Sequence, residues 1–155
     1  MLHYRRLDHV GFTVSSLERS IPFYTFLLGN EPVFRASWDR EAFVARIVGY
    51  PEIQMAAAFW QLPGGAVLEL IEYQQPACVY VDMETSNVGN AHLGLVTDDI
   101  HAEFERLRDH VDFRNQAPVL IPSGPFKGGY AVYFRDPDGI TIEIIQEPRA
   151  GADAS

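Results

Sequence analysis

The stretch Asp8-His9-Val10-Gly11-Phe12-Thr13-Val14 has a second version 83 residues further along, Ala91-His92-Leu93-Gly94-Leu95-Val96-Thr97. His9 corresponds to His92 and Gly11 corresponds to Gly94. The apolar positions that follow recur with the same offset: Leu17, Ile21, Tyr24 and Leu28 are matched by Ile100, Phe104, Leu107 and Val111. Each copy reads as a strand and then a helix, which indicates a duplicated module.

The composition is that of a folded protein. The chain has 155 residues, of which 47% are hydrophobic and 12% aromatic, so it can bury a core of about one domain. The net charge of -9 argues against a nucleic-acid partner, because such partners usually require a basic face. Cys78 is the single cysteine, which excludes a disulfide within the chain and a thiolate metal cluster.

The sequence predicts neither a targeting segment nor a membrane partner. No apolar stretch follows the first residues as a signal peptide would require, and the longest apolar run, Met55–Trp60, is too short to span a bilayer. We therefore expect a cytoplasmic protein. The small and polar residues 148–155 are expected to fray.

The expected organisation is a single domain of two modules, at about residues 5–75 and 90–147, joined by a connection at about 76–89. In the first module Ser15 is the expected cap of a helix that runs to Leu28, and Pro22 is expected to kink or divide it. In the second, Asp98 or Asp99 is expected to cap a helix from Ile100. Strands are expected at Leu7–Val14, Glu31–Trp38, Ala42–Val48, Ile53–Leu62, Ala66–Tyr73, Ala91–Val96, Ala117–Ile121, Tyr130–Arg135 and Ile140–Gln146.

Four of these strands carry one ionisable residue each on the face opposite their apolar side chains. Successive side chains of a strand alternate between its faces, so Leu68 and Leu70 point away from Glu69. The other ionisable residues in equivalent positions are His9, His92 and Glu143. A lone histidine or glutamate in a strand is more often structural or solvated than a ligand. Here the histidine and the glutamate recur at equivalent positions of both modules, and this recurrence favours a shared function.

A pseudo-two-fold between the modules would bring two imidazoles and two carboxylates to one cavity. Two carboxylates in an apolar cup repel each other and are poorly solvated, and a divalent cation relieves both problems. Two nitrogen and two oxygen ligands suit Ni²⁺, Zn²⁺, Co²⁺, Fe²⁺ or Mn²⁺.

The chain resembles the vicinal oxygen chelate superfamily, which includes glyoxalase I, methylmalonyl-CoA epimerase, extradiol dioxygenases and the fosfomycin and bleomycin resistance proteins. The resemblance spans roughly residues 5–147 and is carried by Leu7–Gly29, Ala66–Glu72, Ala91–Ile100 and Tyr133–Ile144. It implies an α+β fold of two βαβββ modules forming a cupped mixed sheet around one metal. It also implies His9, Glu69, His92 and Glu143 as ligands.

A complete His-Glu-His-Glu set is closest to the glyoxalase I and methylmalonyl-CoA epimerase pattern. The resemblance therefore implies a lyase or isomerase acting on a small molecule with two adjacent oxygens. Its metal would stabilise an enediolate, and Glu143 or Glu69 would move the proton. Two alternatives stay open: a drug- or metabolite-binding protein without turnover, and an iron-dependent extradiol dioxygenase. A homodimer is expected by analogy.

Contacts to the substrate are less clearly marked in the sequence. The glycine-rich loop around Phe126 and Lys127 precedes a strand of the second module, in a place where family members often close over the site. Tyr130 and Arg46 are further candidates for substrate binding, and Arg35 could serve the same purpose as Arg46. A solvated surface position explains Lys127 equally well.

Overall fold

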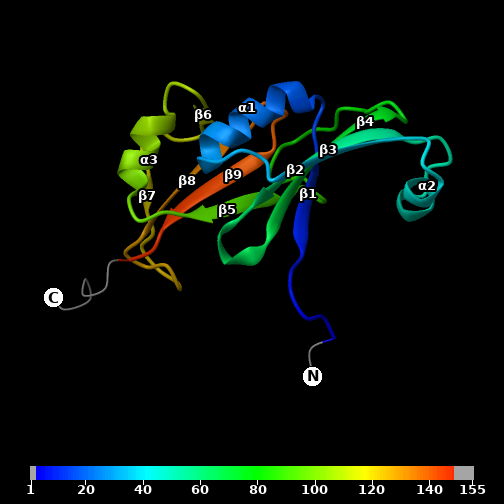
Figure 1. Cartoon of the computed structure of the whole chain (residues 1–155). Coiled ribbons are helices and arrows are strands. Elements are labelled where there is room, and N and C mark those ends of the chain that lie inside the picture. Colours follow the sequence, from blue (N-terminus) through cyan, green and yellow to red (C-terminus); the bar gives the residue numbers. More distant parts are fainter. Residues whose placement is uncertain (1–2, 149–155) are drawn as a thin grey trace. The chain divides into compact units, whose positions relative to one another are not determined.

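The computed structural model describes residues 3–148, and the chain divides into two compact units, residues 1–80 and 81–155 (Figure 1). The boundary falls within the connection predicted at about 76–89. The tail predicted to fray lies outside the described residues beyond 148. Each unit contains one mixed sheet with helical cover, which confirms the α+β class.

Unit 1 is a four-stranded sheet with two helices. Its strand order is β1-β4-β3-β2, with β1 parallel to β4 and the other pairs antiparallel. The elements are β1 (His9–Thr13), α1 (Leu17–Leu28), β2 (Phe34–Asp39), α2 (Ala42–Val48), β3 (Gln54–Gln61), the 3-10 turn η1 (Pro63–Gly65) and β4 (Val67–Gln75).

The first helix covers one face of this sheet and continues through Pro22. Tyr24 and Trp60 are fully buried and pack with ring centroids 6.0 Å apart, while Leu68 and Leu70 are buried on the same face. The helix ends at Leu28, as predicted, and Gly29 follows it in the left-handed conformation at φ 73°. This packing turns the odd-numbered residues of β4, including Glu69, toward the opposite face.

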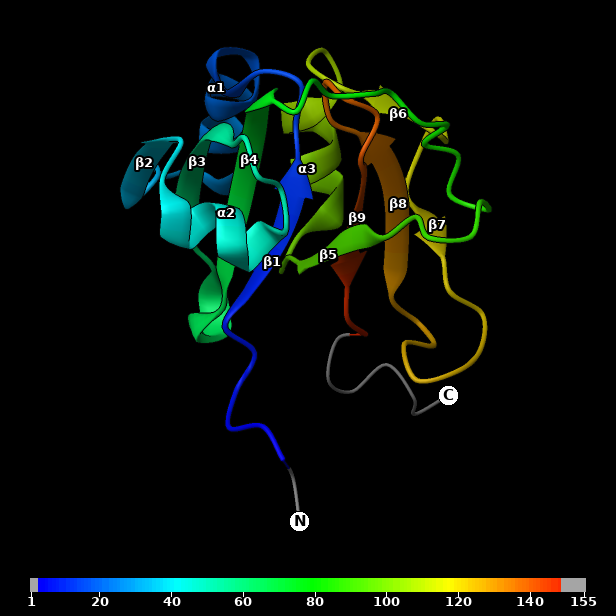
Figure 2. The same ribbon diagram turned by 90° about the vertical axis from the view of Figure 1, so that its right-hand side faces the viewer.

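The predicted strand at Ala42–Val48 is wrong, because the segment forms the helix α2. Its β-branched residues favour a strand locally, but Val44 and Val48 lie one helical turn apart. Val44 is buried with Ile53 and Met55, and Val48 packs against the same cluster. Figure 2 shows α1 and α2 on opposite faces of the sheet. The second helix therefore covers part of the face that carries Glu69.

Unit 2 repeats this plan without a counterpart of α2. Its strand order is β5-β9-β8-β6, with β5 parallel to β9, and β7 pairs with β8. The elements are β5 (His92–Val96), α3 (Ile100–Leu107), β6 (Asp112–Phe113), β7 (Val119–Leu120), β8 (Tyr130–Arg135) and β9 (Thr141–Gln146). Ile100, Leu107 and Ile142 are fully buried in its core.

The two units cap their helices in the same way. The Glu72 carboxylate accepts a hydrogen bond from the Leu17 N–H at the start of α1 (2.7 Å), and the Gln146 amide oxygen accepts one from the Ile100 N–H of α3 (2.8 Å). Both acceptors lie near the end of the last strand of their unit. Glu72, on the same face of β4 as Leu68 and Leu70, therefore satisfies a backbone N–H at the start of α1.

The N-caps refine the predicted helix starts. Ser16, and not Ser15, caps α1 by accepting a hydrogen bond from the Arg19 N–H, while the Ser15 hydroxyl accepts one from the Arg19 guanidinium. Serine is favoured at the N-cap, so the sequence alone allows either of these two consecutive residues. Asp99 caps α3 through the Ala102 N–H, one of the two predicted alternatives.

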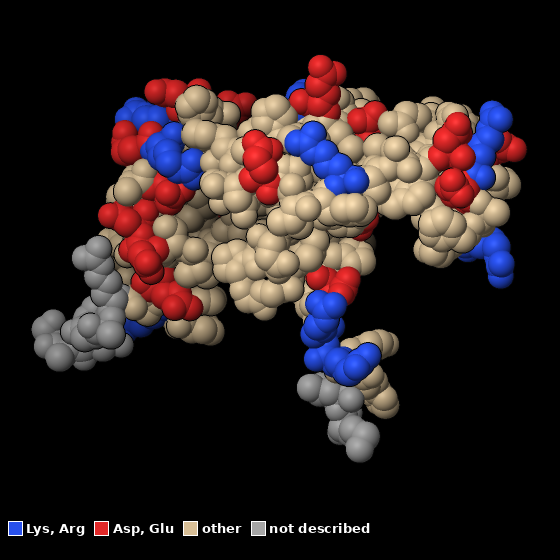
Figure 3. Space-filling model, viewed as in Figure 1, with Lys and Arg blue, Asp and Glu red and all other residues tan. Residues whose placement is uncertain are grey.

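Two further properties bear on the class of protein. Within residues 3–148 no helix is long and apolar enough to cross a membrane. On the face shown in Figure 3 the basic side chains are scattered and do not form a continuous patch.

Candidate functional site

Unit 1 brings His9 and Glu69 together on neighbouring strands. Gly11 of β1 lies opposite Glu69 of the parallel strand β4, which places the imidazole of His9 beside the carboxylate. His9 Nε2 lies 3.4 Å from Glu69 Oε2. The His9 side chain is 50% exposed and the Glu69 side chain only 15% exposed, so the carboxylate is the deeper of the two.

Glycine at position 11 provides the space for this carboxylate. A Cβ atom at Gly11 would lie 3.3 Å from Glu69 Oε2, tighter than an ordinary contact. Burial raises the pKa of Glu69, and the nearby His9 partly opposes that shift. A carboxylate that is costly to ionise by itself is suited to a cationic partner.

Asp8 orients the His9 ring from its other side. His9 Nδ1 lies 3.1 Å from Asp8 Oδ2, and the second Asp8 oxygen contacts the Arg6 guanidinium at 2.5 Å. The hydrogen bond with His9 and the charge of Arg6 lower the pKa of Asp8. An Nδ1–H that donates to a carboxylate leaves Nε2 with its lone pair, which is the arrangement of a metal-binding histidine.

Unit 2 builds the matching pair from β5 and β9. Gly94 lies opposite Glu143, and His92 Nε2 is 3.2 Å from Glu143 Oε2. The exposed fractions of the His92 and Glu143 side chains, 44% and 17%, resemble those of the pair in unit 1. Position 91, which corresponds to Asp8, is an alanine, so no carboxylate precedes His92.

Tyr133 joins this second pair from β8. It lies directly opposite Glu143 in the antiparallel register. Its ring centroid is 5.5 Å from that of His92. Burial, followed by the charge of the nearby Glu143, raises the pKa of Tyr133.

The donor set suits a divalent metal, although no single unit completes a site. Each unit offers one imidazole nitrogen and one carboxylate oxygen, and four ligands of this kind are usual for transition metals. Within residues 3–148 no group of three or more His, Cys, Asp or Glu residues is close enough to hold an ion. The pair in each unit is therefore half of the predicted ligand set.

The predicted substrate contacts are dispersed. Phe126 and Lys127 lie in the exposed loop between β7 and β8. Tyr130 packs its ring on His101 of α3, with centroids 5.0 Å apart, on the face of β8 opposite Tyr133. Arg46 is exposed on the last turn of α2. The structure brings none of these four side chains into contact with a His–Glu pair.

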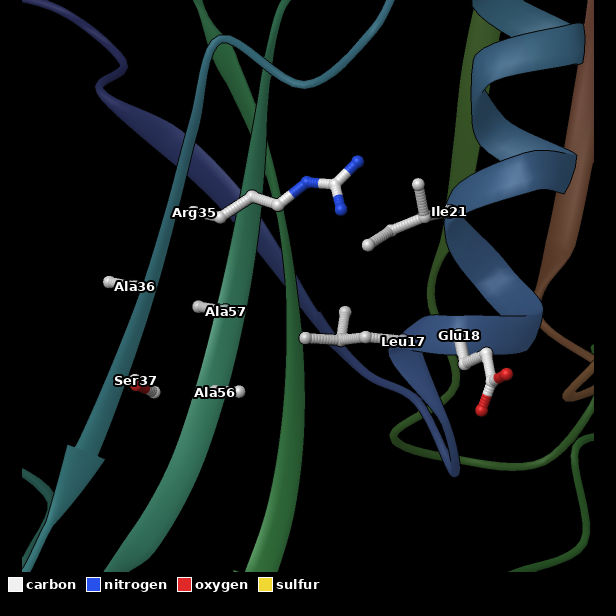
Figure 4. A pocket seen from close by; sticks show the side chains of 8 residues that line it. All are labelled: Leu17, Glu18, Ile21, Arg35, Ala36, Ser37, Ala56 and Ala57. Atoms are coloured by element: carbon white, nitrogen blue, oxygen red, sulfur yellow. The ribbon is translucent and has the colours of Figure 1, made fainter.

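Arg35 contributes to a different feature, a pocket of about 530 Å³ between α1 and strands β2 and β3 (Figure 4). Arg35 pairs with Ala58, whereas Phe34 pairs with Phe59 on the face of Glu69. The guanidinium of Arg35 therefore extends along the helix-covered face, away from the half-site of unit 1. The lining residues are Leu17, Glu18, Ile21, Arg35, Ala36, Ser37, Ala56 and Ala57.

Sequence reasoning missed Asp8 and Tyr133 as partners of the pairs. Asp8 directly precedes the histidine, so the signal was present but not used. Tyr133 could have been found from the turn Asp136-Pro137-Asp138-Gly139: a hairpin folded about that turn pairs Arg135 with Thr141, and two residues further back it pairs Tyr133 with Glu143.

Comparison with known proteins identifies the family. The sequence model of the Glyoxalase/Bleomycin resistance protein/Dioxygenase superfamily matches residues 6–144. The chain belongs to this superfamily, which is the resemblance expected from the sequence.

Curated relatives cover nearly the whole chain. A lactoylglutathione lyase of Neisseria meningitidis serogroup A is 31% identical over 153 residues, which is 96% of this chain and 95% of the relative. A 2-epi-5-epi-valiolone epimerase of an Actinomyces species is also 31% identical, over 94% of this chain and 81% of its own.

Solved structures show the same fold. A glyoxalase family protein of Bacillus cereus matches with a TM-score of 0.80 at 21% identity and covers 96% of this chain and 99% of its own. The trypanothione-dependent glyoxalase I of Leishmania major matches with a TM-score of 0.61 at 25% identity, over 93% and 88% of the two chains. The relatives support a glyoxalase-type function in this superfamily and leave its specific reaction open.

Proposed function

We propose that this protein is a metal-dependent lyase or isomerase of the glyoxalase type, with His9, Glu69, His92 and Glu143 as the ligands of one divalent metal. The observation that carries the proposal is the repeat of the His–Glu pair. Each pair joins the first and last strands of its unit across a glycine, with nitrogen–oxygen distances of 3.4 and 3.2 Å. Surface residues have no reason to recur in this register.

The bound metal would act as a Lewis acid toward two adjacent oxygens of a small substrate. The residues of the chain then supply binding and proton transfer. Glu69 and Glu143 are the two carboxylates able to take a proton from the carbon beside a carbonyl and return it to a neighbouring carbon or to the other face. His9 and His92 are held at these carboxylates by the strand registers.

The candidate metals are Ni²⁺, Zn²⁺, Co²⁺, Fe²⁺ and Mn²⁺, which all accept imidazole and carboxylate ligands. Because each unit offers only two of the four ligands, we include a homodimer in the proposal, in which two chains build the sites together. The names of the relatives suggest two kinds of substrate for this chain: a glutathione thioester such as lactoylglutathione, and a cyclic polyhydroxyketone such as 2-epi-5-epi-valiolone.

The test measures metal content and proton exchange on the same samples. Elemental analysis of the wild type, purified without chelator, is expected to find about one divalent metal per chain, and His9→Ala with His92→Ala is expected to lose it. The protein is then incubated in D₂O with lactoylglutathione or 2-epi-5-epi-valiolone. Loss of the NMR signal of the hydrogen beside the carbonyl reports proton abstraction.

The outcomes separate the candidate functions. Metal-dependent exchange that Glu69→Gln or Glu143→Gln abolishes supports the lyase or isomerase. A wild type that neither contains nor takes up a divalent metal would contradict the proposal. Stoichiometric ligand binding without exchange would point instead to a binding protein, and oxygen consumption with a catechol would point to a dioxygenase.

A further inference from the structure

Unit 1 contains a pocket of about 530 Å³ on the face of its sheet that α1 covers, away from the His–Glu pair (Figure 4). Its walls are the beginning of α1 and the strands β2 and β3, and small side chains form much of its lining. Pockets that bind small ligands typically measure about 300–1,000 Å³. The duplicated module shows what fills the same place in unit 2.

Ala56 in this pocket occupies the same position in unit 1 as Tyr130 does in unit 2. Ala56 lies opposite Glu72, which accepts a hydrogen bond from the first N–H of α1. Tyr130 lies opposite Gln146, which accepts a hydrogen bond from the first N–H of α3. Unit 1 therefore has a methyl group where unit 2 has an aromatic ring.

Two further residues that line the pocket also differ between the units. Ser37 lies opposite the alanine on β2, and Leu120 lies opposite the tyrosine on β7. Glu18 of α1 corresponds to His101 of α3, against which the Tyr130 ring packs with centroids 5.0 Å apart. The ring that fills this place in unit 2 is missing from unit 1, and its space belongs to the pocket.

The pocket carries one basic and one acidic side chain, at different ends. Arg35 reaches from β2 toward Ile21, whereas Glu18 lies near Leu17, about one helical turn earlier in α1 (Figure 4). The Arg35 side chain is 59% exposed, and its guanidinium lies 3.6 Å from the Glu31 carboxylate. An exposed ion pair of this kind is weak, so the guanidinium can exchange this partner for the carboxylate of a ligand.

We propose that this pocket is a binding site for a small aromatic carboxylic acid, separate from the candidate metal site. The ring of the ligand occupies the space above Ala56 that the Tyr130 ring fills in unit 2, and it packs against Ile21. The carboxylate of the ligand pairs with Arg35. A phenol hydroxyl at the opposite end of the ring donates a hydrogen bond to the Glu18 carboxylate.

The experiment is a calorimetric titration of the protein with desaminotyrosine, which is tyrosine without its amino group. Saturable binding of one ligand per chain is expected. Ala56→Tyr gives unit 1 the ring that unit 2 carries, and it is expected to abolish binding without lowering the thermal midpoint. Arg35→Gln is expected to weaken binding about tenfold, because it removes a charge-assisted hydrogen bond.

Three comparisons serve as controls. Arg46→Gln removes an exposed arginine from α2, on the other face of the sheet, and is expected to leave binding unchanged. Hydrocinnamate, which lacks the hydroxyl, is expected to bind the wild type more weakly than desaminotyrosine does, whereas Glu18→Ala is expected to bind the two acids equally. Ser37→Leu introduces another unit 2 residue at an exposed position and is expected to weaken binding.

The proposal is overturned if the wild type shows no saturable binding, or if Ala56→Tyr or Arg35→Gln binds as tightly as the wild type. If the tyrosine variant does not fold, Ser37→Leu and Arg35→Gln decide the question at exposed positions. The variant with His9→Ala and His92→Ala is expected to bind as the wild type does. Loss of binding in that variant would also overturn the proposal, because the ligand would then occupy the candidate metal site.

Discussion

At the scale of single residues, the candidate site depends on small side chains as much as on the four ligands. Gly11 and Gly94 lie beside the two carboxylates, but they are not equally crowded. A Cβ at Gly11 would lie 3.3 Å from Glu69 Oε2, whereas a Cβ at Gly94 would lie 3.8 Å from Glu143 Oε2. The second distance is an ordinary van der Waals contact and the first requires the carboxylate to shift.

This difference predicts unequal effects of the same substitution. Gly11→Ala is expected to weaken Co²⁺ binding by about tenfold, because small displacements of a ligand carboxylate are costly in a metal site. Gly94→Ala serves as the matched control and is expected to change binding by less than about twofold. Titration of both metal-free proteins with Co²⁺ measures the effect. Equal losses in the two variants would show that the crowding at Glu69 is unimportant.

At the scale of secondary structure elements, each unit ties its helix to its last strand by one side-chain hydrogen bond. Glu72 serves α1 and Gln146 serves α3, in corresponding positions. The two acceptors differ in charge, but each presents a side-chain oxygen to the first N–H of its helix. The helix and the sheet are thereby fixed to each other at the edge of each unit, which keeps the strand faces with the His–Glu pairs directed away from the helix.

The repeated cap predicts a simple ranking of variants. Glu72→Ala leaves the partly buried N–H of Leu17 without its acceptor and is expected to lower the free energy of unfolding by about 1–2 kcal/mol. Glu72→Gln keeps an oxygen in place, as Gln146 does naturally, and is expected to cost less than about 0.5 kcal/mol. Urea unfolding monitored by circular dichroism measures both. A glutamine variant as unstable as the alanine variant would contradict the capping role.

The segment that precedes β5 is anchored to unit 2 by Glu84. Its carboxylate accepts hydrogen bonds from Arg114 (2.7 Å) and Arg135 (3.0 Å), and from the hydroxyl and N–H of Thr85. The hydrogen bond from Arg114, followed by that from Thr85, lowers the pKa of Glu84 from 4.5 to about 2. The folded protein therefore binds fewer protons at this group than the unfolded chain does.

This lowered pKa predicts how the stability changes in acid. The contribution of Glu84 is fully present above about pH 4.5 and is lost as the pH falls toward 2. Glu84→Gln is therefore expected to flatten the fall of the thermal midpoint between pH 5 and pH 2. Arg114→Gln is expected to produce part of the same flattening, and the double variant no more than Glu84→Gln alone. An unchanged pH profile in Glu84→Gln would refute the assignment.

At the scale of the whole molecule, the chain consists of two compact units that each carry half of the predicted ligand set. The same mixed sheet is built twice, with its first and last strands parallel and side by side. The units differ in two respects. Unit 1 alone contains the helix α2, and it has Phe59 opposite its glutamate where unit 2 has Tyr133. The two units therefore share one plan and differ in these features.

The division of the ligands predicts complementation between defective chains. One variant carries His9→Ala with Glu69→Ala, and the other carries His92→Ala with Glu143→Ala. We expect each to be metal-free alone and the co-expressed mixture to regain metal, because in the proposed homodimer an intact unit 1 of one chain can meet an intact unit 2 of the other. Elemental analysis of the purified mixture measures the recovery. A mixture that remains metal-free, beside a metal-containing wild type, would show that each chain completes its own site.

Part of the fold and of the candidate site could be predicted, because local sequence patterns specify it. The recurrence of His9 and Gly11 at His92 and Gly94 revealed the duplication, and the period-two alternation predicted the faces of the strands. The strand at Ala42–Val48 was predicted wrongly, because three of its residues are β-branched and only the packing of Val44 against Ile53 and Met55 selects a helix.

The sequence by itself determined the two-module plan, the family and the four candidate ligands, because all of these depend on residue order and on the periodicity of strands and helices. Only the tertiary structure decided which neighbours surround the ligands. The position of Tyr133 opposite Glu143 and the hydrogen bond from α1 to the Glu72 carboxylate depend on strand register and on rotamers. These are set by contacts between residues distant in the chain, and local sequence patterns do not specify them.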